Sequence, residues 1–324
     1  MNIADIEYLL AVQEHRNIGR AAEALGISQP ALTRAVARLE AFAGQQLFTR
    51  HPKGVLPTPA GEMLARRAQR ILIEYQDAER ELQQVKTGQL GLIRVGYSTS
   101  VNWEVVSAAM HRLLRERPTT RLRLSELFMQ DLLDQLADGK LDMIVGPLPA
   151  LMPADLVASV LYRDRLHVVA DRHHPLARKK VVRLKDVAAQ RWQMSGPHTL
   201  IRKLLDQRVA DAKLAPLDVR VETHSGNPNQ LGMLTGTQML TVCSEWSLDV
   251  LPQFDLVPLT VADLPLDRDI GMMRRAHAYV PPIARRLEEL LVAQCDPSLP
   301  APAGAPPSPP VRILQTPLKH QRRP

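Results

Sequence analysis

The chain has 324 residues, of which 45% are hydrophobic and 23% are charged, and its formal net charge is +7. This length exceeds what one ordinary core accommodates, so we expect two or three globular domains. No apolar run approaches the ~18 residues that span a membrane, and the N-terminus lacks the basic segment of a secretory signal, which excludes membrane and secreted classes and predicts a cytoplasmic protein.

The positive charge is not concentrated near the N-terminus, because residues 1–90 contain 11 Lys and Arg against 10 Asp and Glu. Any nucleic-acid binding by this region would therefore depend on where individual arginines point and not on bulk charge. The two cysteines, Cys243 and Cys295, supply no disulfide framework and suit a reducing compartment.

The stretch Gly19–Glu40 has the pattern of two short helices joined by a tight turn. Gly26 suits the C-terminal end of the first helix, and Ser28 is a favourable N-cap for the second. Apolar residues at i, i+4 and i+7 give the second helix one buried face, formed by Leu32, Val36 and Leu39. The pattern predicts a helix-turn-helix whose second helix can enter a DNA major groove.

The segment Ile3–Gly61 resembles the DNA-binding domain of LysR-type transcriptional regulators. The resemblance runs through AAEALGISQPALTRAVARLE, through QQLFTR at Gln45–Arg50 and through TPAG at Thr58–Gly61. It implies a winged helix-turn-helix domain over residues 1–58, with double-stranded DNA as a partner. The alternative is an amphipathic helical hairpin without a DNA role.

Several polar residues lie on the predicted exposed side of the second helix and on the wing. Glutamine pairs well with adenine and arginine with guanine, whereas flanking residues hold phosphates. The predicted DNA-binding residues are Arg20, Ser28, Gln29, Pro30, Thr33, Arg34, Arg38, Arg50 and Lys53. For each charge, the alternative is a solvated surface residue.

From Pro59 to about Lys86 the chain has the pattern of one long helix. Its apolar residues alternate between spacings of four and three, which is a heptad seam. The seam consists of Leu64, Ala68, Ile71, Tyr75, Ala78, Leu82 and Val85. Such a narrow seam favours a partner helix, so we predict dimerisation within a linker of residues 59–90. Packing of this helix on its own domain is the alternative.

After Gly91 strands alternate with helices, which predicts parallel pairing in an α/β sheet. The expected strands are Leu92–Tyr97, Arg121–Leu127, Leu141–Val145, Leu166–Ala170, Asp218–Glu222, Met239–Cys243 and Asp269–Met273. The expected helices are Asn102–Glu116, Met129–Ala137, His198–Asp211, Ser225–Leu234 and Pro282–Ala293.

The resemblance implies that residues 91–295 form a two-lobed effector-binding domain like a periplasmic binding protein. Lobe I would comprise residues 91–164 and 266–295, and lobe II residues 165–265. The remaining segment, residues 296–324, contains 9 prolines and is predicted to be disordered. The expected fold class is therefore α/β overall, after a winged helix-turn-helix and a linker helix.

One strand ends at Ser98 directly before a helix, where unpaired N–H groups and hydroxyls favour a carboxylate, a phosphate or a sugar oxygen. Similar regulators place effector contacts here, and other strand ends are expected to face the same cleft. The predicted effector-binding residues are Ser98, Thr99, Ser100, Gly146, Ser195, His198, Thr199 and His224. A small carboxylate is the preferred effector, and a sugar or sugar acid is the second choice.

The sequence contains no nucleophile elbow, zinc motif, P-loop or dinucleotide fingerprint, so we expect no enzyme activity, cofactor or metal. A redox-responsive regulator that uses Cys243 and Cys295 is the main alternative; a solute-binding protein is another. The resemblance implies that effector binding shifts the packing of a homodimer or homotetramer. That shift would change the DNA bend and contact with RNA polymerase.

Overall fold

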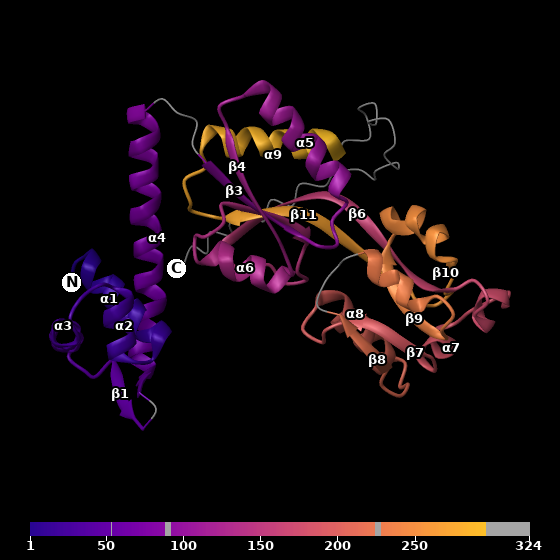
Figure 1. The fold of residues 1–324 in the computed structure, drawn as a ribbon, viewed down its shortest axis with the longest axis horizontal. Helices are drawn as coiled ribbons and strands as arrows, with labels where there is room; N and C mark the ends of the chain where they lie inside the picture. The colour runs from indigo at the N-terminus through magenta and orange to yellow at the C-terminus, as the bar shows by residue number, and fades with distance from the viewer. Residues whose placement is uncertain (53, 88–91, 224–227, 296–324) are drawn as a thin grey trace, which may run out of the picture. The chain divides into compact units, whose positions relative to one another are not determined.

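The computed structural model describes residues 1–52, 54–87, 92–223 and 228–295, and the chain divides into two compact units. Unit 1 is Met1–Gly88 and unit 2 is Gln89–Pro324 (Figure 1). Among the described residues, no helix combines the length and the apolar character needed to cross a membrane.

Unit 1 is a small helical domain with a two-stranded wing. The wing strands pair antiparallel, with Phe48 opposite Pro57 and His51 opposite Gly54. The elements are α1 (Ile3–His15), α2 (Ile18–Ala24), α3 (Gln29–Ala43), β1 (Phe48–His51), β2 (Gly54–Pro57) and α4 (Pro59–Thr87). The predicted winged helix-turn-helix is thus confirmed.

The turn between α2 and α3 forms as its sequence predicts. Gly26 has a positive φ of 65°, and the N–H of Ile27 donates to the carbonyl of Ala22 at 3.0 Å, which closes the end of α2. The Ser28 hydroxyl accepts the N–H of Ala31 at 3.4 Å and caps α3. The predicted apolar faces are buried together in one core with Ala21, Ala22, Leu32, Val36 and Leu39.

The start of α4 is locked against the rest of unit 1. The Thr58 hydroxyl accepts the N–H of Gly61 at 3.0 Å and donates to the carbonyl of Gln46 at 2.8 Å. Gly61 packs so closely on the backbone carbonyl of Leu47 that a Cβ atom there would overlap it. This contact explains why a glycine follows the TPA segment.

Unit 2 contains the alternating strands and helices. Its strands are β3 (Leu92–Ser98), β4 (Arg121–Leu127), β5 (Met143–Pro147), β6 (Leu156–Asp171), β7 (Arg191–Ser195), β8 (Asp218–Thr223), β9 (Met239–Ser244), β10 (Leu256–Leu259) and β11 (Asp267–Arg275). Its helices are α5 (Trp103–Glu116), α6 (Met129–Ala137), α7 (Leu184–Ala188), α8 (Leu200–Asp211) and α9 (Pro282–Cys295), with 3₁₀ turns η1 (Pro175–Arg178), η2 (Pro228–Leu234) and η3 (Glu245–Phe254).

These strands form one sheet in the order β4-β3-β5-β11-β6-β9-β7-β8, with β10 added on β6. The pairs β3–β4, β3–β5, β7–β8 and β7–β9 are parallel. In contrast, β11 pairs antiparallel with both β5 and β6, and β6 pairs antiparallel with β9. The two long strands β6 and β11 therefore join two parallel α/β halves.

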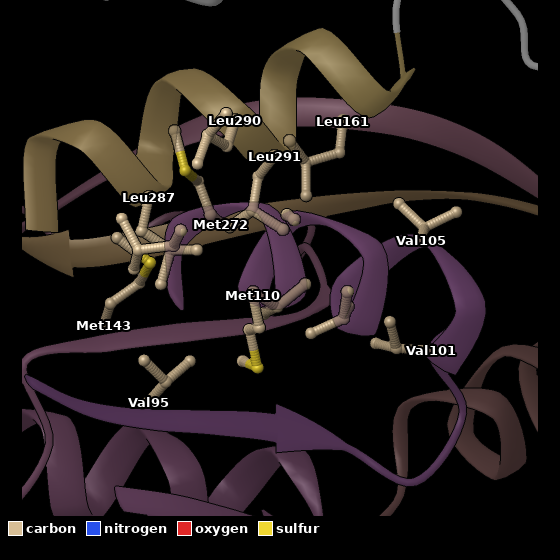
Figure 2. Packing of buried hydrophobic residues seen from close by; sticks show 14 of the residues in the cluster. Val95, Val101, Val105, Met110, Met143, Leu161, Met272, Leu287, Leu290 and Leu291 are labelled. Atoms are coloured by element: carbon tan, nitrogen blue, oxygen red, sulfur yellow. The ribbon is translucent and has the colours of Figure 1, made fainter. Parts of the chain in front are cut away.

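Each half has its own core. In the first, α5 and α9 cover the sheet and bury residues such as Val95, Met110 and Leu287 (Figure 2). The second is built around the fully buried Trp192. Strand β6 passes from the first core at Tyr162 to the second at Leu166. We call the parts around these cores lobe I and lobe II; the predicted residue limits of the lobes remain a prediction.

Several expected elements differ from those in the structure. The strand expected at Leu166–Ala170 is the second half of the longer β6, because the strand begins in lobe I. The helix expected over Ser225–Leu234 is the 3₁₀ turn η2 from Pro228 onward, and residues 224–227 lie outside the described part. The predicted strand was too short because β6 contributes to both cores, and the local sequence does not indicate that the strand continues from one core into the other.

Candidate DNA-binding and effector sites

Helix α3 presents a polar, exposed face. Among the predicted DNA-binding residues, Arg20, Ser28, Gln29, Pro30, Thr33, Arg34, Arg38 and Arg50 are all exposed, whereas Lys53 lies outside the described residues. Since Leu32, Val36 and Leu39 bury the opposite face, α3 is held by its apolar side with its polar side open to solvent.

These polar residues differ in how far they are already engaged. Arg38 forms an ion pair with Asp5 of α1 at 3.2 Å, and the Thr33 hydroxyl donates to the carbonyl of Gln29 at 2.9 Å. Arg34 has no ion pair among the residues that the structure describes. Arg34 is thus more available than Arg38 for an outside anion or base.

Unit 2 contains a cavity of about 220 Å³ between the two lobes. Lobe I contributes the end of β3, the start of α6 and Pro147, and lobe II contributes the ends of β7 and β9 and the start of α8. Of the predicted effector residues, the cavity is lined by Ser98, Thr99, Ser100, Ser195, His198 and Thr199.

Two predicted effector residues are not placed in this wall. Gly146 does not line the cavity but lies beneath it, where a Cβ atom would crowd the sulfur of Met129 and the Cβ of Ser98. We therefore assign Gly146 to packing, because its missing side chain lets those two residues approach. His224 lies outside the described residues.

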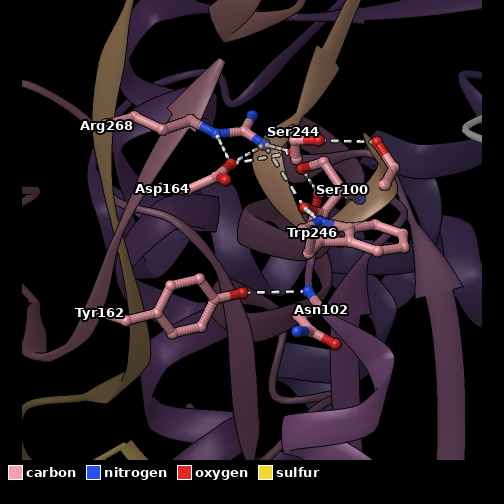
Figure 3. Close-up of polar contacts among 9 residues, drawn as sticks. Ser100, Asn102, Tyr162, Asp164, Ser244, Trp246 and Arg268 are labelled. Carbon is pink, nitrogen blue, oxygen red and sulfur yellow. Dashed lines mark hydrogen bonds and ion pairs between the residues drawn. The ribbon is translucent and has the colours of Figure 1, made fainter. Parts of the chain in front are cut away.

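A hydrogen-bonded cluster that includes Ser100, Ser244, Trp246 and Arg268 of the cavity wall ties the lobes together (Figure 3). The carbonyl of Ser100 accepts from the Trp246 indole at 3.2 Å and from Arg268 at 3.4 Å. Arg268 pairs with the buried carboxylate of Asp164 at 2.7 Å, and the Ser244 hydroxyl donates to the same carboxylate at 2.9 Å. The Arg268 charge is therefore balanced within the cluster.

The expected anion site at the start of α5 needs correction. Asn102 caps this helix with its own side chain, which accepts the N–H of Glu104 at 3.0 Å, and the N–H of Asn102 donates to Tyr162 at 3.0 Å. The hydroxyls of Ser98 and Ser100 are hydrogen bonded to each other at 3.0 Å. These hydroxyls remain in the cavity wall, but at the start of α5 the N–H groups of Asn102 and Glu104 already have partners within the protein.

Two other helices begin at the cavity without a side-chain cap. Phe128 precedes α6 and offers no capping atom. Thr199 precedes α8, but its hydroxyl donates to the carbonyl of Gly196 at 2.8 Å instead of capping the helix. The side chains that line the cavity include those of Met129 and Leu200, the first residues of these helices. The first N–H groups of α6 and α8 are therefore available near the cavity from opposite lobes.

The family models identify both units. The model described as the LysR substrate binding domain matches residues 86–296, and the bacterial regulatory helix-turn-helix model of the lysR family matches residues 3–62. The chain belongs to the LysR family of transcriptional regulators. As members of this family bind DNA, the exposed face of α3 belongs to a DNA-binding domain.

Individual LysR-type proteins agree with this assignment. The chain is 30% identical over 207 residues to the HTH-type transcriptional regulator GbpR of Rhizobium radiobacter, which covers 63% of this chain and 68% of the relative. A full-length cysteine variant of OxyR from Pseudomonas aeruginosa has the same fold, with a TM-score of 0.62, 23% identity and coverage of 90% and 94%. Full-length CbnR complexed with its target DNA matches with a TM-score of 0.57, 19% identity and coverage of 90% and 99%.

Only some residues of the predicted heptad seam of α4 are exposed in this LysR-type regulator. Ala68 is fully buried in the unit 1 core and offers no surface to a partner, whereas Leu64 packs against that core and is half-buried. Farther along α4, Ile71 is 45% exposed, Tyr75 43% and Leu82 69%. Ala78 is also exposed, and the side chain of Val85 is outside the described set.

The two thiols of this LysR-type regulator are poorly suited to redox chemistry. Burial raises the pKa of Cys243 to about 11 and that of Cys295 to about 12. Because the thiolate is the reactive form, a raised pKa lowers reactivity near neutral pH. Cys243 lines the cavity, whereas Cys295 does not, so the cavity does not bring the two thiols together.

Sequence reasoning missed several cavity residues, including Phe128, Gln193, Trp246 and Arg268. Gln193 lies within the short strand β7, of which only the end at Ser195 was predicted from the sequence, and Trp246 lies in the 3₁₀ turn η3. Arg268 comes from the returning strand β11, 168 positions after Ser100. A glutamine between two apolar residues, Trp192 and Met194, was the available signal.

Proposed function

We propose that this LysR-type regulator binds a small organic anion, most simply a carboxylate, in the cavity between the lobes of unit 2. The observation that carries the proposal is the pair of uncapped helix starts, α6 from lobe I and α8 from lobe II. Each helix N-terminus has a partial positive charge and unpaired N–H groups, which favour a bound anion.

The charges in the cavity wall support the same proposal. The lining residues of the described chain include His198, Lys203 and Arg268 but no Asp or Glu. Arg268 is balanced by Asp164, so the helix starts and Lys203 give the cavity its positive character. Apolar residues such as Phe128, Met194 and Trp246 would pack on the carbon skeleton of the ligand.

Paired probes test whether the ligand must be an anion. Benzoate is compared with benzamide, and gluconate with gluconamide, by calorimetric titration of the full chain. Each pair has nearly the same shape but differs in charge. The proposal predicts that an acid binds and that its amide binds at least about tenfold more weakly, because hydrogen bonds to a charged group are the stronger ones. Equal binding of acid and amide, or binding of the amide alone, would contradict it.

We further propose that α3 contacts operator DNA through Gln29, Thr33 and Arg34, and that α4 joins two copies of the chain. Support comes from the exposed polar face of α3 and the exposed apolar residues of α4. Such a protein acts where bacterial promoter DNA is, in the cytoplasm, as a regulator and not as an enzyme. An effector then changes DNA bending and contact with RNA polymerase only if it binds the two domain arrangements with different affinity.

A further inference from the structure

The side chain of Gln193 leaves one buried hydrogen-bond acceptor unused in the wall of the cavity. Gln193 lies on β7 and is only 4% exposed, yet it lines the cavity. Its Oε1 atom is buried and has no hydrogen-bond partner among the described residues. Buried acceptors normally have a partner, so this atom indicates a missing donor.

The orientation of the Gln193 amide is fixed by its other end. The Nε2 atom donates to the backbone carbonyl of Gln230 at 3.0 Å. If the amide were turned over, Oε1 would face that carbonyl and two acceptors would meet. The acceptor is therefore the end that is left for a ligand.

The charges around the cavity restrict which chemical group of a ligand can donate a hydrogen bond to Gln193 Oε1. An ammonium group would lose water on entering and would need a carboxylate to balance it, but the lining residues of the described chain include no Asp or Glu. A hydroxyl group donates one hydrogen bond without bringing a charge. A neutral donor such as a hydroxyl therefore fits beside Gln193.

We propose that the effector is a hydroxylated organic acid, with its carboxylate at the starts of α6 and α8 and a hydroxyl donating to Gln193 Oε1. This inference rests on the anion site proposed above. Gln193 would then be the residue that distinguishes a hydroxy acid from the parent acid without the hydroxyl. Such discrimination is strong when the alternative leaves a buried acceptor unpaired.

The test uses acids that differ only by one hydroxyl. Benzoate, 3-hydroxybenzoate and 4-hydroxybenzoate form one series, and butanoate, 3-hydroxybutanoate and 4-hydroxybutanoate form a second. Their dissociation constants are measured on the full chain by calorimetry. We expect at least one hydroxy acid to bind about tenfold more tightly than its parent. The Gln193→Met variant should reduce that advantage to about twofold or less, while the parent acid binds as before.

Two further variants control for folding and for the loss of an amide. Gln190→Met removes a glutamine whose Nε2 also donates to a backbone carbonyl, that of Asp186 at 3.0 Å, but which does not line the cavity. It should leave the hydroxyl advantage unchanged. In Gln193→Glu, a protonated carboxyl group can donate to the Gln230 carbonyl and keep its other oxygen as the acceptor, so this variant should retain the hydroxyl advantage.

The outcomes separate this inference from the anion site. If acids bind but the hydroxyl gives no advantage, or the advantage survives in Gln193→Met, the role of Gln193 is overturned and the anion site stands. An ordered water would then satisfy Oε1. If no acid of either series binds while a neutral amide does, the anion site fails and this inference fails with it.

Discussion

At the scale of single residues, the surroundings of a charge decide what the charge does. Asp164 and Arg268 form an ion pair whose side chains are 2% and 13% exposed. Asp269 and Arg163 form one on the same pair of strands with exposures of 36% and 64%. Water screens the second pair but not the first.

This contrast predicts different costs for the same substitution. Asp164→Asn should lower the free energy of unfolding by about 3 kcal/mol, because it leaves the buried Arg268 without its counter-charge. Asp269→Asn is the matched control and should cost about 1 kcal/mol or less. Urea unfolding of both variants gives the comparison. Equal, small losses would show that the Arg268 charge is balanced in another way.

The thiols give a prediction about pH. Because burial raises the pKa of Cys243 to about 11, its reactive thiolate is a minor form at pH 8 in the folded protein. Labelling by iodoacetamide should be slow at pH 8 and should become faster as the pH rises toward 11, as far as the protein stays folded. Rapid labelling of Cys243 at pH 7 would contradict this and would revive a redox-responsive regulator.

At the scale of elements, helix α4 combines a tight internal contact with an exposed apolar stripe. Its first turn is fixed by Gly61 on the carbonyl of Leu47. Its later turns expose Ile71, Tyr75 and Leu82. The N-terminal end of α4 is therefore anchored in unit 1. The side chains of Ile71, Tyr75 and Leu82 form an apolar stripe that is exposed.

The anchor predicts that Gly61→Ala destabilises unit 1, since the added methyl group overlaps backbone that cannot move without shifting α4. We expect a loss of about 1–3 kcal/mol in thermal unfolding. Gly19→Ala is the control, because its Cβ would come no closer than 3.3 Å to the Asn17 side chain. It should change stability by less than about 1 kcal/mol. If both alanines are tolerated equally, the contact at Leu47 is not rigid.

The stripe predicts self-association through α4. Leu82→Glu places a charge where the proposed interface needs an apolar side chain, so sedimentation equilibrium should show weaker association by about tenfold or more. Gln76→Glu introduces the same charge at another exposed position of the helix, outside the heptad seam, and should have a smaller effect. An unchanged association constant in Leu82→Glu would remove α4 from the interface.

At the scale of the whole molecule, the sequence predicts elements that are determined by residues close together in the chain. It does not predict contacts between residues on strands that are far apart in the chain. The helix-turn-helix follows from local caps and spacing, as Gly26 and Ser28 demonstrate. The strand-end residues of the cavity, such as Ser98 and Ser195, were also predicted. Trp246 and Arg268 were missed, because they reach Ser100 from lobe II and from the returning strand β11. The α5 start was overestimated as an anion site because Asn102, just past the serines, takes the capping role.

Specific DNA recognition by this LysR-type regulator is proposed to depend on the exposed face of α3. We would measure fluorescence anisotropy of its own upstream DNA and of an unrelated promoter, across a range of salt concentrations, with the wild type and Arg34→Ala. We expect Arg34→Ala to lose about 1–3 kcal/mol of binding free energy, with reduced preference for the upstream site. Arg38→Ala should lose less, because Arg38 is already paired with Asp5. Binding that is indifferent to both the DNA sequence and Arg34 would contradict recognition through α3.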